Sequence, residues 1–472
     1  MIIYNRIPRG LAVAGLAASL ILTACGGGES GSIGAGAPAA TTVGSISGFG
    51  SVIVNGVRFD DSAARVTDDA DNSISSSSLG LGTTVEVSGS VNDDGTGSAS
   101  SINVFSEVQG PILKLNAGTF SILGFNVSVD GATVYADFSG LSALVDGDIV
   151  EVHGIRSGNA ITATRIERKT PVAGDILIKI RGQVAALNKL TNTFTIGNVT
   201  VKYVAGDVSP NVDALDNGDF VKVRSKSVAT GNTVTASRVQ VVGIRPFGFA
   251  DNGKAELEGV VSDFVRLDQF KVGGIAVDAS TATFVRGQST SIANGTRLEV
   301  KGVYTNNVIT ASKVKFEDGA RVDEFELHGL VSNFTSLSNF VVRGVTVDAS
   351  GSGVLFERGL ASEVATTRRV LEVEGSIVST TSGSILRATK VKFEELKGSD
   401  TATGAGEFEF KGSVISTSGD TMVVGTRTVN LTEKTVFRRM TRAQIVKGAF
   451  LEIKGKLQSD GSVLAERISL ED

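Results

Sequence analysis

Short stretches in which apolar and polar residues alternate recur along the whole chain, and Gly, Asn and Asp separate them. Alternation with a period of two is typical of a strand with one buried face. No segment keeps the longer period of an amphipathic helix, so the pattern predicts an all-β protein. One alternating pattern repeats five times, at residues 82–87 (GTTVEV), 147–152 (GDIVEV), 218–223 (GDFVKV), 295–300 (GTRLEV) and 448–453 (GAFLEI).

Two further signatures place this pattern inside a longer repeat. Each of six copies opens on a Gly that shortly precedes β-branched residues, and closes on an Ala three residues before another β-branched residue. In the fifth copy Arg368 replaces the Gly of the middle pattern, and in the third Ser225 replaces a Gly that follows it. The opening glycines are Gly44, Gly110, Gly182, Gly259, Gly329 and Gly412, and the closing alanines are Ala99, Ala163, Ala236, Ala311, Ala388 and Ala465.

Each copy has room for five or six short strands. A unit of this size must close its sheet or pack it against a neighbour, because open sheet edges and a small core are unfavourable. We therefore predict a tandem array of six small β-barrels similar to the OB fold, with small β-sandwiches as the alternative. The predicted modules are residues 43–106, 107–170, 178–243, 255–317, 325–394 and 408–472, and their short joints predict a semi-rigid string.

The three signatures together resemble the bacterial domain of unknown function 5666, which is often found in tandem in exported proteins. The resemblance covers nearly all of residues 43–470. The matching residues are turn glycines and core positions. The resemblance therefore implies a fold, and it carries no catalytic residue over to this chain.

Residues 1–24 have the order of a secretory signal peptide, with two arginines before an apolar stretch at residues 11–22. That stretch is too short to be a comfortable membrane span. Residues 22–25 (LTAC) resemble the lipobox of bacterial lipoproteins. This resemblance implies cleavage before Cys25, a covalent lipid on Cys25 and anchoring of the protein in a membrane.

The residues after Cys25 refine this expectation. Residues 25–42 are small, polar and rich in Gly, which predicts a flexible tether. Residue 26 is Gly. By resemblance to proteobacterial lipoproteins, this favours an outer membrane lipoprotein that faces the periplasm or the cell surface.

Composition excludes several classes of protein. The 472 residues include 57 Gly but only 2 His, 1 Cys and no Trp, and the net charge is −5. One Cys excludes an intramolecular disulfide framework and a Cys-rich zinc site, and we expect neither a metal nor a cofactor. The scarcity of His predicts that the protein is not an enzyme. An acidic chain without Trp lacks the basic, aromatic surface of a nucleic-acid binder, so we expect no nucleic-acid partner.

An aromatic residue followed by basic residues recurs in the last three copies. In a regular strand, an Arg two residues after a Phe lies on the same face, which is unusual for a core position. These residues predict a contact to an acidic ligand, or packing between neighbouring modules. They are Phe284, Arg286, Phe356, Arg358, Phe437, Arg438 and Arg439.

Two other features favour structural interpretations. His153 and His328 each lie beside a Gly at the end of a predicted strand. The aspartates of residues 60–61 and 68–71 are rich in oxygen, as Ca²⁺ requires, but they lack the order of an EF-hand loop. We therefore expect a solvated acidic loop there.

These features together predict a lipid-anchored bacterial envelope protein that acts as a non-enzymatic spacer, scaffold or binding surface. Its expected partners are the membrane, reached through the lipid on Cys25, and an envelope protein or glycan. The alternative is a binding module for envelope glycan or another acidic ligand. An enzyme is the least favoured function.

Overall fold

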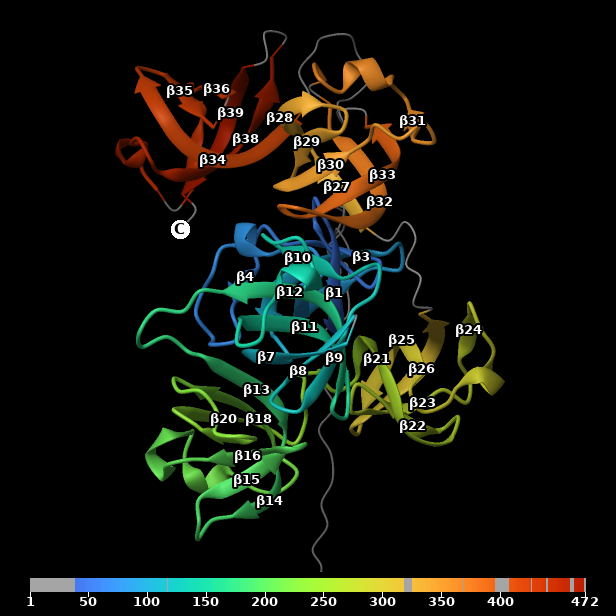
Figure 1. The fold of residues 1–472 in the computed structure, drawn as a ribbon. Coiled ribbons are helices and arrows are strands. Elements are labelled where there is room, and N and C mark those ends of the chain that lie inside the picture. Colours follow the sequence, from blue (N-terminus) through green and yellow to red (C-terminus); the bar gives the residue numbers. More distant parts are fainter. Residues whose placement is uncertain are drawn as a thin grey trace, which may run out of the picture. The chain divides into compact units, whose positions relative to one another are not determined.

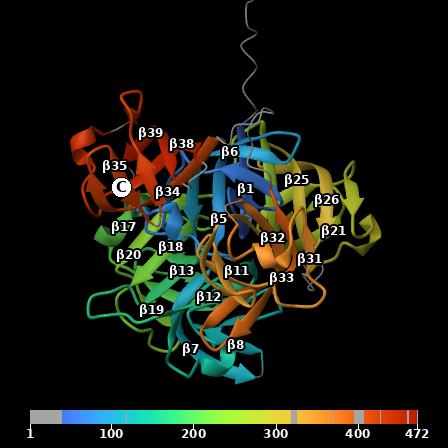
Figure 2. The ribbon, with the colours of Figure 1, turned by 90° about the horizontal axis from the view of Figure 1, so that it is seen from above.

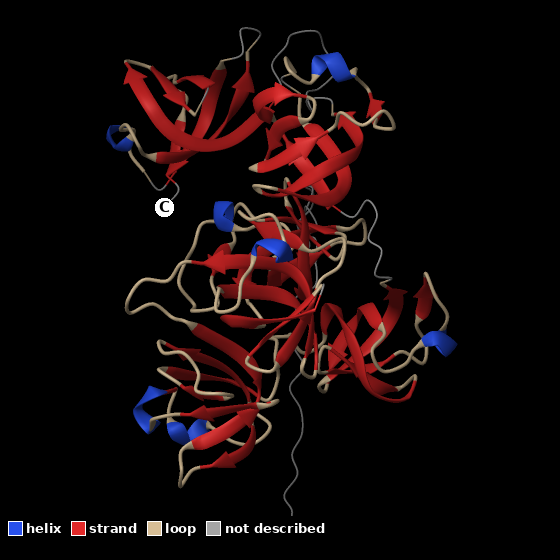
Figure 3. Ribbon diagram, in the orientation of Figure 1, coloured by secondary structure: helices blue, strands red, loops and turns tan. Residues whose placement is uncertain are grey.

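The computed structural model describes residues 39–116, 118–317, 325–367, 369–394, 407–425, 427–438, 440–458 and 462–470. In this part of the chain, strands alternate with turns, and the helices are short 3-10 turns (Figures 1 and 3). The strands fall into six successive groups, one for each predicted module.

The strands of the first two modules follow the same order along the chain. Module 1 has β1 (Ala39–Phe49), β2 (Val52–Val54), β3 (Val57–Asp60), β4 (Arg65–Thr67), η1 (Ser76–Ser78), β5 (Thr84–Val91) and β6 (Thr96–Val104). Module 2 has β7 (Val108–Asn116), β8 (Thr119–Ile122), β9 (Phe125–Ser128), β10 (Val134–Ala136), η2 (Leu141–Ala143), β11 (Ile149–Ser157) and β12 (Ala160–Lys169).

The next two modules lie between residues 178 and 316. Module 3 has β13 (Ile178–Gln183), β14 (Ala185–Asn188), β15 (Thr193–Ile196), β16 (Val199–Lys202), η3 (Ala205–Asp207), β17 (Val208–Ser209), η4 (Val212–Ala214), β18 (Phe220–Ser225), β19 (Thr233–Thr235) and β20 (Arg238–Gly243). Module 4 has β21 (Gly253–Arg266), β22 (Gln269–Val272), β23 (Ile275–Asp278), β24 (Thr283–Val285), η5 (Ser289–Ser291), β25 (Arg297–Thr305) and β26 (Val308–Phe316).

The last two modules repeat this order. Module 5 has β27 (Phe325–Gly329), β28 (Val331–Ser336), β29 (Asn339–Val342), β30 (Val345–Asp348), β31 (Leu355–Glu357), η6 (Ala361–Glu363), β32 (Leu371–Thr380) and β33 (Gly383–Phe393). Module 6 has β34 (Glu407–Ser418), β35 (Thr421–Val424), β36 (Arg427–Asn430), β37 (Val436–Arg438), η7 (Arg442–Gln444), β38 (Phe450–Leu457) and β39 (Val463–Leu470).

The strand pairing closes each sheet into a ring. In module 1, β1 pairs antiparallel with β2 and β5, β2 with β3, and β5 with β6, while β3 pairs parallel with β6. This is the strand order of an OB barrel. Module 2 has the same ring, as do modules 4, 5 and 6. The modules are therefore small barrels, and the sandwich alternative does not apply.

Module 3 has the same order of strands around the ring, but its sheet is interrupted at two places. Its first and last strands are each split in two, as β13 and β14 and as β19 and β20. One half of the module pairs as β14–β15–β16–β19, while in the other half β18 pairs with both β13 and β20. The split between β19 and β20 lies next to the end of β18, where the Ser237 N–H donates to the Arg224 carbonyl oxygen at 2.8 Å. Ser225, the residue after Arg224, stands where the other five copies have Gly.

The alternating residues of the repeat form the barrel cores. Val85 and Val87 of the middle pattern are fully buried, as are Ala99 and Ile102 of the closing signature. The equivalent residues Val373, Ala388 and Val391 are buried in module 5. The prediction of an all-β fold with small barrel modules is confirmed.

Strand pairing also joins modules that are distant in sequence. Strand β1 pairs parallel with β21 of module 4 through residues 40–43, and with β27 of module 5 through Gly48 and Phe49. Figure 2 shows β1 among strands of these modules. Strand β7 of module 2 pairs with β13 of module 3. Modules 1, 4 and 5 thus share one hydrogen-bonded sheet, which a simple string of modules would lack.

The first strand begins earlier than the sequence suggests. Strand β1 starts at Ala39, within residues 25–42, which the sequence assigns to the tether. Residues 40–43 are buried and pair with β5 and β21, which explains why they are ordered. The predicted signal peptide at residues 1–24 and the rest of the tether lie outside the described residues.

Candidate functional site

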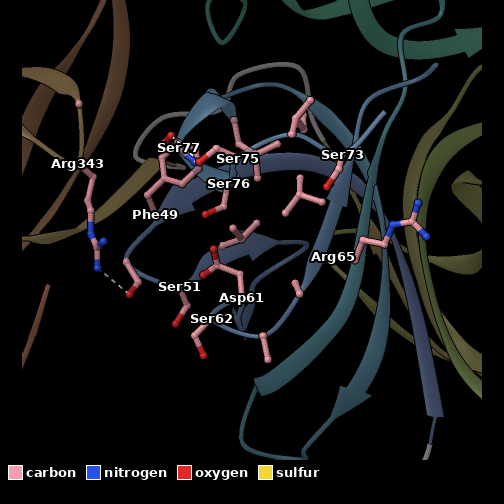
Figure 4. A pocket seen from close by; sticks show the side chains of 18 of the residues that line it. Phe49, Ser51, Asp61, Ser62, Arg65, Ser73, Ser75, Ser76, Ser77 and Arg343 are labelled. Atoms are coloured by element: carbon pink, nitrogen blue, oxygen red, sulfur yellow. Dashed lines mark hydrogen bonds between the residues drawn. The ribbon is translucent and has the colours of Figure 1, made fainter. Parts of the chain in front are cut away.

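A cavity of about 610 Å³ opens on module 1, beside the loop between β3 and β5. Figure 4 shows Ser75, Ser76 and Ser77 on one side of the opening, and Ser51, Asp61 and Ser62 on the other. The buried residues Val52, Val66 and Leu79 form its apolar floor. The cavity therefore combines a hydroxyl-rich wall with an apolar base.

The serine side chains around this cavity differ in how they are used. Ser75 caps the short helix η1, because its Oγ accepts a hydrogen bond from the Ser77 N–H at 3.2 Å. The hydroxyls of Ser51, Ser62, Ser73 and Ser76 make no hydrogen bond within the described residues. Each can both donate and accept, so this wall is suited to a neutral, hydroxyl-rich molecule.

Residues from other modules complete the rim. Phe49, at the end of β1, lines the cavity together with Arg343 of module 5 and Phe450 of module 6. Arg343 Nη2 donates to the carbonyl oxygen of Gly50 at 3.2 Å (Figure 4). The Nε of Arg343 donates to the carbonyl oxygen of His328 at 2.9 Å. The serine run at residues 75–78 is visible in the sequence, whereas the rim residues come together only through the contacts between modules.

The predicted aromatic and basic residues separate in the structure. Phe284, Phe356 and Phe437 are half-buried and pack against the cores of modules 4, 5 and 6. Arg286 and Arg358 are exposed, and both have φ of +59°, so the regular-strand geometry assumed for them does not hold. Arg438 is exposed at the end of β37, and Arg439 lies outside the described residues.

Binding of an acidic ligand by these arginines stays a prediction. Arg286 lines a small cavity together with Lys315 and four glutamates, so acidic side chains outnumber basic ones there. The glutamates are Glu258, Glu299, Glu317 and Glu326. Arg358 uses its carbonyl oxygen to accept a hydrogen bond from Arg369 Nη1 at 2.7 Å. The structure does not bring the three pairs together into one site.

His153 joins modules 1 and 2. Its side chain is 3% exposed on β11, and its Nδ1 lies 2.8 Å from the carbonyl oxygen of Phe105 and 3.1 Å from Thr84 Oγ1. Burial lowers the pKa of His153, so the imidazole is neutral and Nδ1–H donates to the Phe105 carbonyl. This side chain therefore has a structural role at the junction.

His328 lies in a charged cluster between modules 1 and 5. Its Nε2 is 2.8 Å from Glu326 Oε1 and 3.5 Å from Glu372 Oε2, and the three residues bring one possible metal ligand each within 4.8 Å. Cations already neutralise the carboxylates, because Arg58 pairs with Glu326 at 2.5 Å and Lys392 with Glu372 at 2.5 Å. This arrangement favours a salt-bridged junction over a metal site.

The electrostatics of Glu372 agree with that assignment. Burial alone raises the pKa of this carboxyl, but the hydrogen bond from Lys392 outweighs it, and the pKa falls to about 2. Glu372 is therefore ionised and paired at neutral pH. His328 lies against module 1 in two ways: its Nε2 is 3.3 Å from Arg58 Nη1, and a Cβ on Gly50 would stand 2.1 Å from the His328 Cβ.

The acidic residues of module 1 are only partly solvated as the sequence suggests, since Asp60 and Asp71 are exposed whereas Asp69 is half-buried. Asp69 pairs with Lys179 of module 3 at 3.1 Å, and Asp71 accepts a hydrogen bond from Gln240 at 2.8 Å. Burial raises the pKa of Asp71, but Gln240 and the charge of Lys222 outweigh it and hold the pKa below its ordinary value. The loop is therefore a docking contact between modules 1 and 3.

A difference in charge between two parts of the sequence could have indicated this contact. Residues 25–170 hold 7 basic against 16 acidic residues, while residues 171–254 hold 10 basic against 6 acidic. Opposite charge on two modules favours their association. The sequence does not predict which side chains form the contact between modules 1 and 3.

Comparison with known proteins identifies the repeat. One family model, that of a domain of unknown function (DUF5666), matches residues 42–103, 109–167, 181–240, 258–315 and 411–469, which together are more than half of the chain. The chain belongs to the DUF5666 family. The resemblance seen in the sequence is thereby confirmed, and each match falls on one barrel.

Module 5 lies outside the DUF5666 matches, although its strands form the same ring. A solved structure of drosophila Unr, CSD456, is similar at 19% identity over 40% of this chain and 85% of that chain, with a TM-score of 0.12. No curated protein matches this DUF5666 chain. None of the helices in the described residues is long and apolar enough to cross a membrane.

Proposed function

We propose that this DUF5666 protein is a lipid-anchored component of the bacterial cell envelope, and that its barrels form a non-enzymatic scaffold. The anchor rests on the sequence: a signal peptide precedes the lipobox-like residues 22–25, and the Cys of this motif is the only Cys in the chain. Cys25 itself lies outside the described residues. The proposed location is the outer membrane, facing the periplasm or the cell surface.

The observation that supports a scaffold is the pairing of β1 with β21 and β27. Strand pairing between modules fixes their register through main-chain hydrogen bonds, and a scaffold needs such fixed relative positions. The two imidazoles are also engaged in structural contacts, His153 with the Phe105 carbonyl and His328 with Glu326. Both arrangements favour a structural role over catalysis.

Two experiments test this proposal. Mass spectrometry of the protein from its native membrane should find a lipid-modified Cys25, and a Cys25→Ser variant should leave the membrane fraction. A Cys25→Ser protein that still fractionates with membranes would contradict the anchor. Affinity purification from cross-linked envelopes should retain envelope proteins, and a chain that retains neither a protein nor a glycan would contradict the scaffold and the binding alternative together.

A second candidate function is the binding of envelope glycan at the serine-lined cavity. It is supported by four hydroxyls without a hydrogen-bond partner in the described residues, together with Asp61 and the ring of Phe49 at the same opening. Sugars combine hydroxyl groups with apolar ring faces, and this wall offers partners for both.

The glycan candidate predicts a selective effect of blocking the cavity. A Ser76→Leu variant should lose retention on purified peptidoglycan or lipopolysaccharide, because the larger side chain fills the opening. Ser352→Leu, at an exposed position of module 5 away from the cavity, should bind as the wild type does. Equal binding by both variants would exclude this cavity as the glycan site.

A further inference from the structure

A second cavity, of about 260 Å³, lies where the first four modules meet. Its walls include Phe105, which follows the last strand of module 1, Arg156 of module 2, Arg181 of module 3 and Phe247 of the segment before module 4. Glycines form much of the remaining wall and keep the space free of side chains. They are Gly44, Gly154, Gly158, Gly182, Gly259, Gly273 and Gly274.

Arg181 is the central charged group of this cavity. Its side chain, on β13, is 5% exposed. The guanidinium carbon lies 4.1 Å from the ring centroid of Phe105 and 5.0 Å from those of Phe220 and Phe247. These cation–π contacts stabilise the positive charge through the faces of the guanidinium, and they leave its N–H edges for other partners.

The N–H edges of Arg181 are largely unused. Its Nη2 donates to the carbonyl oxygen of Pro246 at 3.3 Å, and its buried Nε has no hydrogen-bond partner. No other hydrogen bond from this guanidinium is found within the described residues. A buried donor without an acceptor is costly, so an acceptor from outside the chain would stabilise this guanidinium.

Arg369 of module 5 provides a comparison within the same chain. It also stacks on a ring, that of Phe393, with its guanidinium carbon 5.1 Å from the centroid. Its three nitrogens donate to the carbonyl oxygens of Glu394, Arg358 and Phe393 at 3.2, 2.7 and 2.7 Å. The chain therefore gives every nitrogen of one stacked guanidinium an acceptor, whereas the other, on a cavity wall, has an acceptor among the described residues at Nη2 only.

The charges around the cavity favour an anion. Arg156 adds a second guanidinium, whose Nη1 donates to the carbonyl oxygen of Arg181 at 2.5 Å. Glu258 is already paired with Arg297 at 2.7 Å. Glu107 is the one acidic side chain on the wall that faces the two arginines without a hydrogen bond or ion pair in the described residues. On the wall itself, two positive charges thus face one unpaired negative charge, while Glu86 and Asp69 act on Arg181 from outside the cavity.

We propose that this cavity binds a small organic anion, a carboxylate or a phosphate monoester with an apolar body. The free edge of Arg181 would receive the anionic group, since guanidinium binds carboxylate and phosphate through paired N–H donors. The apolar body would lie against Phe105, Phe247 and Ile155. This site is independent of the scaffold and of the serine-lined cavity.

The test uses the full-length protein in detergent, with benzoate and phenyl phosphate as probes and benzyl alcohol as their uncharged match. Ligand-detected NMR should find saturable binding of at least one anion and weaker binding of the alcohol. The relative affinities of benzoate and phenyl phosphate distinguish a carboxylate site from a phosphate site. Absence of saturable binding by both anions, or equal binding of the alcohol, would overturn the proposal.

Two variants and one control locate the binding. Arg181→Lys should weaken anion binding by about tenfold or more, because Lys lacks the planar fork. Glu107→Gln should tighten it by several-fold, because it removes the opposing charge. Arg369→Lys replaces a stacked guanidinium away from the cavity and should leave the affinity unchanged. If Arg181→Lys does not fold, the Glu107→Gln result decides, and unchanged or weaker anion binding would overturn the proposal.

Discussion

Gly375 on β32 lies directly opposite Ala388 on β33, at a β-bulge that begins between Glu374 and Gly375. A Cβ on Gly375 would stand 2.1 Å from the carbonyl oxygen of Arg387, a backbone atom that cannot move aside easily. The same relationship joins Gly89 to Ala99, Gly154 to Ala163, Gly302 to Ala311 and Gly455 to Ala465. Two of the sequence signatures therefore meet at one bulge, which bends the strand so that the barrel can close.

Substitution of this glycine should destabilise its module. Gly375→Ala should lower the free energy of unfolding of module 5 by about 1–3 kcal/mol or more, because the new methyl group overlaps the partner strand. Gly353→Ala is the control, since a Cβ there meets no atom within 4 Å. Hydrogen exchange of β32 and β33 measures the difference. Equal protection from hydrogen exchange in both variants would show that the close approach of Gly375 to β33 does not determine the stability of module 5.

The ion pair between Asp69 and Lys179 should stabilise the contact of modules 1 and 3. The two side chains are 13% and 22% exposed, so solvent screens them incompletely. A double-mutant cycle with Asp69→Asn and Lys179→Met should give a coupling of about 0.5–1.5 kcal/mol. The exposed pair Lys189–Asp216 should couple by less than about 0.5 kcal/mol. A coupling no larger than that of the exposed pair would contradict the docking role of the loop.

His153 should make the junction of modules 1 and 2 sensitive to mild acid. Its pKa is lowered in the folded protein because burial disfavours the imidazolium. The unfolded chain therefore binds a proton more readily, and the stabilisation present above the ordinary pKa of about 6.5 is lost as the pH falls. Calorimetry between pH 8 and pH 5 should find a smaller decrease of the unfolding midpoint in His153→Asn than in the wild type. Parallel curves would argue against this linkage.

Gly48 should control the pairing of modules 1 and 5. It lies opposite Glu326 in the parallel pairing of β1 with β27, and a Cβ there would stand 2.2 Å from the Glu326 carbonyl oxygen. Gly48→Ala should therefore increase the hydrogen exchange of the amides at residues 326–328 while the β32–β33 pairing stays protected. Gly131→Ala, where a Cβ meets no atom within 4 Å, serves as the control. Unchanged exchange in Gly48→Ala would mean that the two strands are not held in this register.

The candidate sites were less predictable than the fold. Phe284, Phe356 and Phe437 were recognised as recurring positions, and they pack on the barrel cores. The cavity that contains Arg181 could not be found in the same way. Its walls come from four modules, and the ring of Phe105 and the guanidinium of Arg181 are more than seventy residues apart in the chain. No local sequence pattern predicts a contact between residues so far apart in the chain.

The sequence by itself determined the barrel and its repetition, because both depend on local rules. Alternating residues such as Val85 and Val87 specify which face of a strand is buried, and a Gly at each bulge permits the close approach of two strands. Tertiary structure alone decided which modules pair and what their junctions hold. The register between modules depends on the edges of strands and on single side chains, such as Gly48 opposite Glu326 or Asp69 paired with Lys179. These contacts do not repeat along the chain, so no periodic sequence pattern predicts them.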